Sequence, residues 1–388
     1  MPDVEDSLTS DVYDYALVGG GLANGLIALA VRAHQPDARI AMVERGDAPG
    51  GNHTWCFHAR DVSSTMGWIE PLVEHRWPGY DVMFPEHSRR LDTPYACVSA
   101  TRLSACVSNA LAVPGSALFT KTTATEIADE RVTLDNGNVI QARAVIDARG
   151  PDRYAETLAV ETGWQKFVGQ EVTLRKPHGL ERPILMDATV PQVDGYRFFY
   201  VLPLSENRLL VEDTYFSDSS DLDAAHVRTE IDAYCHSQGW LVASIDREEA
   251  GVLPMPLSTA APTPGSPFIA GYAGRWFHPV TAYSFPIAAR VAELVASRPA
   301  DELVGPALQQ LARAHGKQLA FGDRLNKMLF RWFAPEKRHH VLARFYRLPP
   351  ATIERFYALQ LTGMDRARIF VGRPPKGLSI RAMFGGSP

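Results

Sequence analysis

The sequence has little cysteine and no long apolar run. Its 388 residues include 4 cysteines, which are scattered without C-x-x-C spacing: Cys56, Cys97, Cys106 and Cys235. This pattern argues against a disulfide framework or a cysteine-based zinc site and is typical of reduced thiols in the cytosol. No run of about 18 uncharged apolar residues occurs, so we predict no transmembrane helix. The acidic N-terminus lacks the apolar segment of a secretory signal, and we expect a cytoplasmic protein.

Positive charge is concentrated at the C-terminus. The whole chain has a formal net charge of −5, yet residues 321–388 hold 13 Lys and Arg against 4 Asp and Glu. A basic tail on an acidic body indicates an anionic surface as partner. No nucleic-acid-binding motif accompanies the charge, so we do not expect nucleic acid. The histidines lack the spacing of metal ligands, so we expect no metal site, and the sequence gives no indication of oligomeric state.

A glycine-rich loop follows the first apolar run. Residues 13–18 are predicted to form a buried strand, residues 22–33 a helix, and residues 39–44 a strand ending in an acid. This βαβ order predicts a dinucleotide site, and the alternative is a glycine-rich loop in another α/β fold. Asn24 replaces the third glycine of the motif, which we expect to loosen slightly the packing of helix on strand. The candidate cofactor-binding residues are Gly19, Gly20, Gly21, Ala23, Asn24, Glu44 and Arg45.

Three later segments also place glycine at the end of a strand or in a loop. A second glycine loop covers residues 49–54, and a hairpin around residues 136–137 leads into a strand ending at residue 150. Residues 267–274 form a strand and a glycine turn, which continues through residues 278–284 into a helix predicted over 286–297. This order resembles flavoproteins of the glutathione-reductase type, in the branch containing the aromatic hydroxylases, and implies FAD. Further candidate residues are Gly51, His53, Thr54, Asp147, Gly150, Gly271, Gly274, His278, Pro279, Thr281 and Tyr283.

Two residues of the last segment have open roles. In the resembling flavoproteins, Gly-Asp usually ends the final strand and the Asp binds the ribityl chain, whereas here Tyr272 follows Gly271. The ordinary hydroxylase placement of the flavin is therefore in question. His278 either contacts the flavin ring or stabilises the turn by a hydrogen bond.

The middle of the chain is rich in strands and carries three acids. Residues 194–204 and 208–215 are predicted to form an antiparallel hairpin, and a short strand over 184–189 carries Asp187. Glu212 and Asp213 are neighbours on one strand, so at most one of them faces a given pocket. A carboxyl group buried among apolar groups has a raised pKa and acts as an acid. The alternative is that both acids pair with Arg197 or Arg208 at a sheet edge.

Five long strings of residues resemble those of the bacterial lycopene β-cyclases. Residues 326–330 and 344–349 add shorter matches, so the likeness covers nearly the whole chain. The resembling family shares both the asparagine in the glycine loop and the missing ribityl Asp. The strings are Gly50–His58, Met186–Val190, Gly195–Leu204, Leu210–Thr214 and Phe277–Pro286.

This resemblance implies an enzyme that converts the ψ-ends of lycopene to β-ionone rings, through γ-carotene to β-carotene, without net redox change. It implies FAD that is active when reduced, with NAD(P)H as the reductant. An acid protonates C2 of the terminal double bond, the C5=C6 bond attacks the C1 cation, and loss of the C6 proton completes the ring. The family's acidic motif falls on Glu212, Asp213 and Thr214, and a second one on Asp187. We favour Glu212 over Asp213 as proton donor, and whether the acid or the flavin protonates the substrate stays open.

Two other function classes remain. One is an FAD-dependent monooxygenase or reductase acting on an isoprenoid lipid, and the other is a non-enzymatic carotenoid-binding protein with a flavin fold.

Tyr196, Phe198 and Tyr200 occupy every second position of one strand and so share a face, where they either line a substrate tunnel or pack in the core.

The C-terminal region interleaves basic and aromatic residues. Arg344-Phe-Tyr and Arg355-Phe-Tyr recur about three helical turns apart, so we expect them on similar helix faces. Such a region suits peripheral association with the inner face of the membrane, where lycopene resides. The alternative is a helical cap on the substrate domain.

The expected architecture is an α/β, glutathione-reductase-type FAD-binding (Rossmann-like) fold with an antiparallel β-sheet substrate domain and a helical C-terminal region. We expect the FAD-binding domain to comprise residues 12–100, 101–155 and 263–300. The substrate domain is expected over 156–262, and the helical, basic, membrane-associating region over 301–388.

Overall fold

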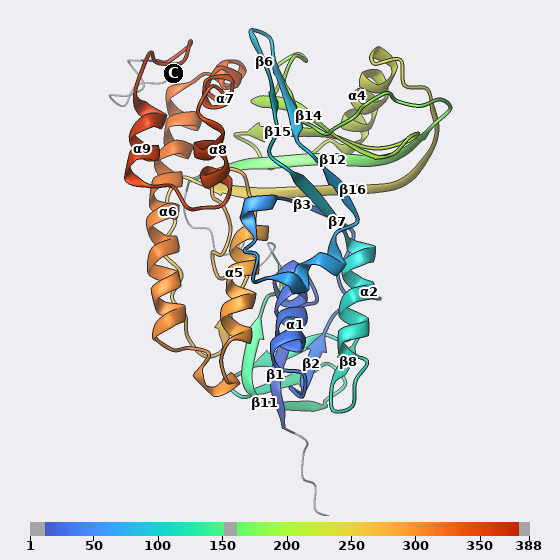
Figure 1. Ribbon diagram of the computed structural model, residues 1–388, viewed down its shortest axis with the longest axis vertical. Coiled ribbons are helices and arrows are strands. Elements are labelled where there is room, and N and C mark those ends of the chain that lie inside the picture. The colour runs from blue at the N-terminus through green and yellow to red at the C-terminus, as the bar shows by residue number, and fades with distance from the viewer. Residues whose placement is uncertain (1–11, 151–160, 380–388) are drawn as a thin grey trace, which may run out of the picture.

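The computed structural model describes residues 12–150 and 161–379. Figure 1 shows a sheet with helices at the bottom, a second sheet at the top, and C-terminal helices beside both. The combination of an α/β layer, a strand-rich layer and a helical C-terminal region agrees with the architecture predicted from the sequence.

The first sheet is built around parallel strands. Its strands are β1 (Tyr13–Val18), β2 (Ile40–Val43), β8 (Ala117–Phe119), β9 (Ala124–Ile127), β10 (Arg131–Leu134), β11 (Val139–Asp147) and β17 (Phe268–Ile269). The order β8-β2-β1-β11 is parallel throughout, β17 adds a parallel partner to β11, and β9 and β10 extend the sheet as antiparallel strands. The βαβ unit therefore opens this sheet as predicted, and β1 is its central strand.

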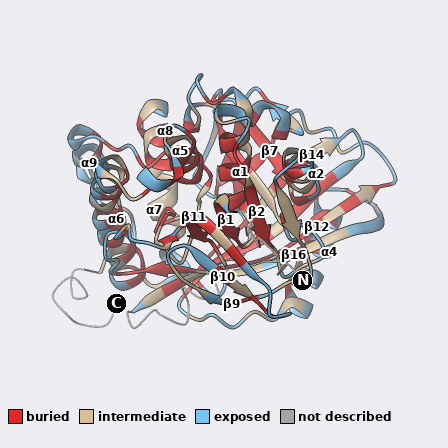
Figure 2. Cartoon of the chain, turned by 90° about the horizontal axis from the view of Figure 1, so that it is seen from below, coloured by how far each residue is buried: buried red, intermediate tan, exposed pale blue. Residues whose placement is uncertain are grey.

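Alternation along β1 fills both faces of this sheet. Tyr15 and Leu17 belong to the core beneath the helices, whereas Ala16 and Val18 belong to a second core under the β9–β10 hairpin. Figure 2 shows β1 and β2 buried between these layers. The helices on the first face are α1 (Leu22–His34), α2 (Ala100–Leu111) and α5 (Phe285–Ala296).

Asn24 joins α1 to the ends of two strands. Its side chain is fully buried, and its amide nitrogen lies 3.0 Å from the Val18 carbonyl oxygen, 2.9 Å from that of Gly19 and 3.4 Å from that of Ile146. The expectation of slightly looser helix packing at this position stays a prediction, and the amide joins the helix to the strands by direct hydrogen bonds.

The second sheet is long and mostly antiparallel. Its order is β16-β12-β15-β14-β13-β5-β6, and only the β13–β5 pair is parallel. Two of its strands come from residues 80–91, inside the segment expected to belong to the FAD-binding domain. The strands are β5 (Tyr80–Phe84), β6 (His87–Leu91), β12 (Thr162–Leu174), β13 (Ile184–Asp187), β14 (Tyr196–Ser205), β15 (Arg208–Ser217) and β16 (Val242–Pro256).

Each face of the second sheet has its own cover. Helix α4 (Ala224–Ser237) packs on one face, against a core that includes Val211 and Phe199. The other face meets the C-terminal helices and a small sheet, through a core that includes Leu210 and Phe198. The small sheet has the order β3-β7-β4, with bounds Thr54–His58, Tyr95–Ser99 and His75–Trp77.

The C-terminal helices pack on the second sheet. They are α6 (Pro306–Trp332), α7 (His339–Phe345), α8 (Pro350–Tyr357) and α9 (Gly363–Phe370), and short 3-10 helices elsewhere cover Ala59–Asp61, Gly67–Leu72, Ala300–Glu302 and Pro335–Lys337. Arg338 is buried beneath them, with its guanidinium 2.7 Å from the Asp218 carboxylate and 4.7 Å from the ring centre of Phe330. In the parts of the chain described here, no helix is both long and apolar enough to cross a bilayer.

The expected placement of the two Arg-Phe-Tyr strings on similar faces of a helix is wrong. They lie on α7 and α8, which are separate helices because Pro349 and Pro350 interrupt the chain between them. The strings nevertheless meet in space, since the hydroxyl oxygens of Tyr346 and Tyr357 lie 2.6 Å apart in the core.

Replacing Asn24 by alanine tests its role in joining helix and strands. We expect Asn24→Ala to lower the free energy of unfolding by about 1–3 kcal/mol, because buried carbonyls lose their donor. Urea denaturation measures this change. The matched control is Asn207→Ala at an exposed turn, for which we expect a change within about 0.5 kcal/mol; equal losses in both variants would contradict the assignment.

Candidate active site

The two neighbouring acids of β15 point to opposite faces of the second sheet, as their adjacency predicts. Asp213 is fully buried on the face covered by α4. Its oxygens accept hydrogen bonds from Arg197 at 2.9 and 2.8 Å, and from the Tyr215 hydroxyl at 2.8 Å. The alternative interpretation, in which the acids pair with arginines, therefore holds for Asp213, which pairs with Arg197.

Asp187 lies on the same side as Asp213. Its carboxylate accepts hydrogen bonds from the Tyr234 hydroxyl of α4 at 2.8 Å and from the Thr189 hydroxyl at 2.6 Å. The Tyr234 ring stacks on Phe199 with ring centres 3.8 Å apart. These contacts anchor α4 to the sheet, so the structure does not bring Asp187 together with Glu212.

Glu212 faces the other side, toward the small sheet and the glycine loops. Among the described residues, its only side-chain hydrogen bond comes from the Thr214 hydroxyl, at 2.5 Å. Desolvation raises the pKa of Glu212 to about 8, the neighbouring carboxylate of Glu249 adds to the rise, and the Thr214 hydrogen bond opposes it. A carboxyl group with this pKa is mostly protonated at neutral pH and is a candidate proton donor.

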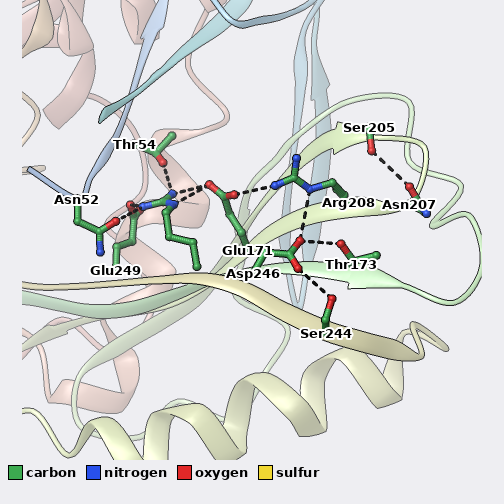
Figure 3. Close-up of polar contacts among 11 residues, drawn as sticks. Asn52, Thr54, Glu171, Thr173, Ser205, Asn207, Arg208, Ser244, Asp246 and Glu249 are labelled. Carbon is green, nitrogen blue, oxygen red and sulfur yellow. Dashed lines mark hydrogen bonds and ion pairs between the residues drawn. The ribbon is translucent and has the colours of Figure 1, made fainter. Parts of the chain in front are cut away.

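The second glycine loop is bound to the strands around Glu212. Arg247 on β16 donates to the Asn52 side chain at 3.0 Å and to the Thr54 hydroxyl at 2.6 Å. The same guanidinium binds Glu249 at 2.6 Å and Glu171 at 2.8 Å. Figure 3 shows these four partners converging on one guanidinium. The loop that follows the first βαβ unit therefore lies beside the face that carries Glu212.

The glycine-rich segments converge at the ends of β1 and β11. The Gly50 amide donates to the Gly20 carbonyl at 2.8 Å, so the two glycine loops lie together. A β-carbon added at Gly271 would contact that of Ala23 at 3.5 Å, which places the last glycine turn on the first turn of α1. At Gly19 an added β-carbon would lie 2.7 Å from the Ala148 carbonyl oxygen, with φ at +91°, so this turn requires glycine.

This convergence leaves a cradle suited to a dinucleotide. An added β-carbon at Gly21, Gly51 or Gly150 would meet no atom within 4 Å, so these backbones border open space. The Glu44 carboxylate at the end of β2 accepts hydrogen bonds from the amides of Gly20 and Gly46, each at 2.7 Å. Bare backbone, a helix N-terminus and a positioned acid fit the pyrophosphate and ribose of FAD.

Other predicted cofactor residues take different positions. Arg45 is exposed, and the buried Asp147 binds the Arg149 guanidinium at 2.9 and 2.7 Å. An added β-carbon at Gly274 would lie 2.0 Å from the Ile269 carbonyl oxygen, which makes this glycine necessary for the turn. His53 is half-buried, and its ring lies 5.9 Å from that of Phe167 on β12.

Hydrogen bonds to other parts of the protein hold the turn after β17 in place. One ring nitrogen of His278 lies 3.0 Å from the Phe356 carbonyl oxygen, and the other accepts from the Val280 amide at 3.1 Å. Burial lowers the pKa of His278 to about 3, so the ring is neutral. These bonds favour the turn-stabilising role. The Pro279 carbonyl accepts from Asn326 at 2.7 Å, while the Thr281 hydroxyl is buried with no hydrogen-bond partner in the part of the chain that the structure describes.

The structure also shows a ring of tyrosines that the sequence analysis missed. The buried His58 has ring-centre distances of 4.9 Å to Tyr95, 5.3 Å to Tyr80 and 4.9 Å to Tyr357. The Tyr95 hydroxyl lies 3.1 Å from that of Tyr200, which is paired with Glu212 across the strands. Sequence spacing gives no signal for this set, because its members come from distant segments.

The alternating aromatics of β14 divide between two environments. Tyr196 and Phe198 are buried and pack with Phe216, with ring-centre distances of 5.5 and 5.8 Å. They are core residues, as one of the two interpretations held. Tyr200 is only partly buried, and its hydroxyl donates to the Cys56 sulfur at 2.9 Å, so it lies between the second sheet and the small sheet.

An apolar cavity of about 220 Å³ opens between this sheet and the C-terminal helices. Phe216 lines it, on the same face of β15 as Glu212, and so does Thr281 of the turn after β17. Phe345, Tyr357 and Phe370 line it from the helices. Within residues 12–150 and 161–379, no group of His, Cys, Asp and Glu is arranged to hold a metal ion.

Solved structures of the same fold include flavoenzymes. A geranylgeranyl bacteriochlorophyll reductase-like protein from Thermoplasma acidophilum superimposes with a TM-score of 0.62 at 13% identity, over 94% of this chain and 97% of that one. A probable FAD-dependent monooxygenase from Pseudomonas aeruginosa gives 0.55 at 15% identity, over 93% of this chain and 100% of that one. This likeness shows an FAD-binding α/β fold, as predicted.

Sequence comparison identifies closer relatives. The chain is 43% identical over 372 residues to the lycopene beta-cyclase of Pseudescherichia vulneris, covering 93% of this chain and 94% of that one. It is 44% identical over 373 residues to the lycopene beta-cyclase of Pantoea ananas, covering 94% and 95%. The family model described as lycopene cyclase protein matches residues 14–383. The chain therefore belongs to the lycopene cyclase family.

Proposed function

We propose that the protein is a lycopene β-cyclase that closes the ψ-ends of lycopene into β-ionone rings, through γ-carotene to β-carotene. The observation that carries the proposal is Glu212, a carboxyl group with a raised pKa on the sheet face that adjoins both the glycine loops and an apolar cavity. Protonation of an alkene needs an acid that is uncharged at neutral pH, and burial provides this. Asp213 is held by Arg197 on the opposite face, so we assign it a structural role.

In the proposed reaction the Glu212 carboxyl donates its proton to C2 of the terminal C1=C2 bond. The π electrons of that bond form the new C–H bond and leave a tertiary cation at C1. The electrons of C5=C6 then close the ring onto C1, and loss of the C6 proton restores the double bond. One proton is added and one is lost, so substrate and product are isomers. The cation must be kept from water, which would hydrate it; the cavity lined by Phe216 has apolar and aromatic walls, although Glu212 itself, four residues along β15, is not among its lining residues.

FAD is the proposed cofactor, reduced by NAD(P)H, and the cradle of Gly21, Gly51 and Gly150 would hold it together with Glu44. When bound and reduced, it would supply negative charge that stabilises a cation nearby. The FAD-binding part would comprise residues 12–100, 101–155 and 263–300, except that β5 and β6 join the sheet of residues 156–262. The Arg247 contacts to Asn52 and Thr54 support a site close to Glu212.

We also propose that α9 and the residue that follows it contact the cytoplasmic surface of the membrane. Met364, Phe370 and Val371 are 64%, 51% and 72% exposed, and Phe370 also lines the apolar cavity. Arg347 and Arg373 line a second, basic cavity beside it. Apolar side chains next to cations suit an anionic lipid surface. The aromatic residues of the Arg-Phe-Tyr strings pack inward. The C-terminal helices would therefore cap the substrate domain and also contact the membrane through α9.

Product mass tests the proposed function. Anaerobic incubation with lycopene, reduced FAD and liposomes should yield a product isomeric with lycopene. A gain of oxygen or of two hydrogens would support a monooxygenase or a reductase, and binding without any product would support a carotenoid carrier.

Glu212→Gln tests the proton donor. We expect the rate of ring closure to fall about 100-fold or more, because the amide cannot donate the proton, while carotenoid binding persists. Initial rates and carotenoid binding spectra measure the two effects. Glu206→Gln, at an exposed turn of the same hairpin, is the control and should keep the wild-type rate. Undiminished turnover by the Glu212 variant would remove this residue from the mechanism.

Replacing Phe370 and Val371 by serine tests the membrane contact. We expect about tenfold weaker co-sedimentation with anionic phospholipid vesicles, because apolar area is lost at the interface. The control replaces Leu241 and Ile245 by serine, which are 49% and 56% exposed on the second sheet. Unchanged binding by the first pair, or equal loss by the control pair, would contradict the assignment.

A further inference from the structure

Gly169 separates two glutamates on adjacent strands. It lies on β12, opposite Glu212 of β15 on one side and opposite Glu249 of β16 on the other. Residues paired directly across antiparallel strands project to the same face. The two carboxyl groups therefore flank one position that carries no side chain.

The absence of a side chain at Gly169 lets the two glutamates approach each other. A β-carbon added there would lie 3.3 Å from Cγ of Glu249, and 3.4 Å from both Cβ and Oε2 of Glu212. The contacts show that both side chains lean over the glycine. Any larger residue at this position would stand between the two carboxyl groups.

Glu249 forms an ion pair, and among the described residues Glu212 forms none. The Glu249 side chain is buried, and its Oε2 lies 2.6 Å from the Arg247 guanidinium. The same guanidinium is held by Glu171, Asn52 and Thr54, so it is fixed in place. A hydrogen-bonded ion pair favours the ionised carboxylate. Within residues 12–150 and 161–379, the Glu212 side chain has only the neutral hydroxyl of Thr214 as a hydrogen-bond partner.

We propose that Glu249 is a positioning residue whose fixed negative charge, across Gly169, keeps Glu212 protonated and ready to donate. This inference rests on the proposed function, in which Glu212 is the proton donor. The two carboxyl groups then hold one proton between them, because two negative charges this close repel each other. Glu249 sets the protonation state of the donor without contacting the substrate.

The other groups near Glu212 do not provide this charge. Tyr200 on β14 and Thr214 on β15 are neutral hydroxyls. His53 from the glycine loop has its pKa lowered chiefly by burial, although the Glu249 carboxylate 3.9 Å away raises it. The positive charge of Arg247 favours an ionised Glu212. Asp213 also raises the pKa of Glu212, but by less than Glu249 does, since it faces away and pairs with Arg197. Glu171 lies on the same face and binds Arg247 and Arg208, whereas Glu249 is the anion on this face that raises the pKa of Glu212.

The test is Glu249→Gln, with the pH dependence of ring closure as the readout. The donor must be protonated, so the rate constant should fall as pH rises through the pKa of Glu212. Removing the negative charge makes Glu212 easier to ionise, so this alkaline limb should move to lower pH, by about one pH unit. The rate at acidic pH should stay close to wild type. Glu249→Asp keeps the charge and should restore the wild-type limb.

The matched control is Glu248→Gln on the same strand. The Glu248 side chain binds Gln170 and Arg228 and lies on the opposite face of the sheet. The alkaline limb of the pH–rate profile of this variant should therefore coincide with that of wild type. Infrared titration of the carboxyl C=O band, assigned by its loss in Glu212→Gln, measures ionisation of Glu212 without turnover. This measurement reports the ionisation of Glu212 even if the Glu249 variant folds but has no activity.

The outcomes separate the inference from the proposed function. An unshifted limb and an unshifted infrared titration in Glu249→Gln, with Glu212→Gln inactive, would overturn the inference and leave the proton donor in place. A shifted limb in the Glu248 variant as well would also overturn it, since the effect would not depend on the Gly169 gap. Full activity of Glu212→Gln would instead overturn the proposed function.

Discussion

The alternation of side chains along β15 is the constraint on which the site depends. Glu212 and Asp213 are adjacent, yet the strand sends one to the flavin-domain side and the other to the α4 side. Asp213 obtains Arg197 and Tyr215 as partners and supports the packing of α4. Glu212 is half-buried and accepts a hydrogen bond only from Thr214 among the described residues, and desolvation raises its pKa. A shift of pairing by one residue would exchange the two environments.

Local patterns made much of the fold predictable. The βαβ unit, the hairpin that carries Glu212 and the helix after the last glycine turn all appear within a few residues of their predicted bounds, because each follows from short-range periodicity and turn chemistry. The opposite orientation of Glu212 and Asp213 followed from adjacency alone. Adjacency does not decide which acid faces the glycine loops, since that depends on where α4 packs, although Glu212 was favoured as the donor.

Long-range pairing explains what was missed. Glu249 lies 37 positions beyond Glu212 and becomes its neighbour only through the registers of β12 with β15 and with β16. Gly169 gives no local signal, because glycine in a strand is consistent with a bulge or close approach of many kinds. Strands β5 and β6 join the second sheet although helix α2 and most of the first sheet follow them in the chain. The interruption at Pro349–Pro350, by contrast, was readable and should have separated α7 from α8.

The fold is shared with oxidoreductases, and the sheet face shows how it could serve a reaction without net redox change. Holding an uncharged carboxyl group in the folded state lowers stability as pH rises from the ordinary pKa of glutamate, about 4.3, toward the raised value, because the unfolded chain releases that proton more readily. This loss of stability is present at neutral pH. Arg197, Asp213 and Asp187 lie on the opposite face of the sheet, where their hydrogen bonds and ion pairs stabilise the same strands. One strand therefore carries the ion-paired Asp213 on one face and the acid with the raised pKa on the other.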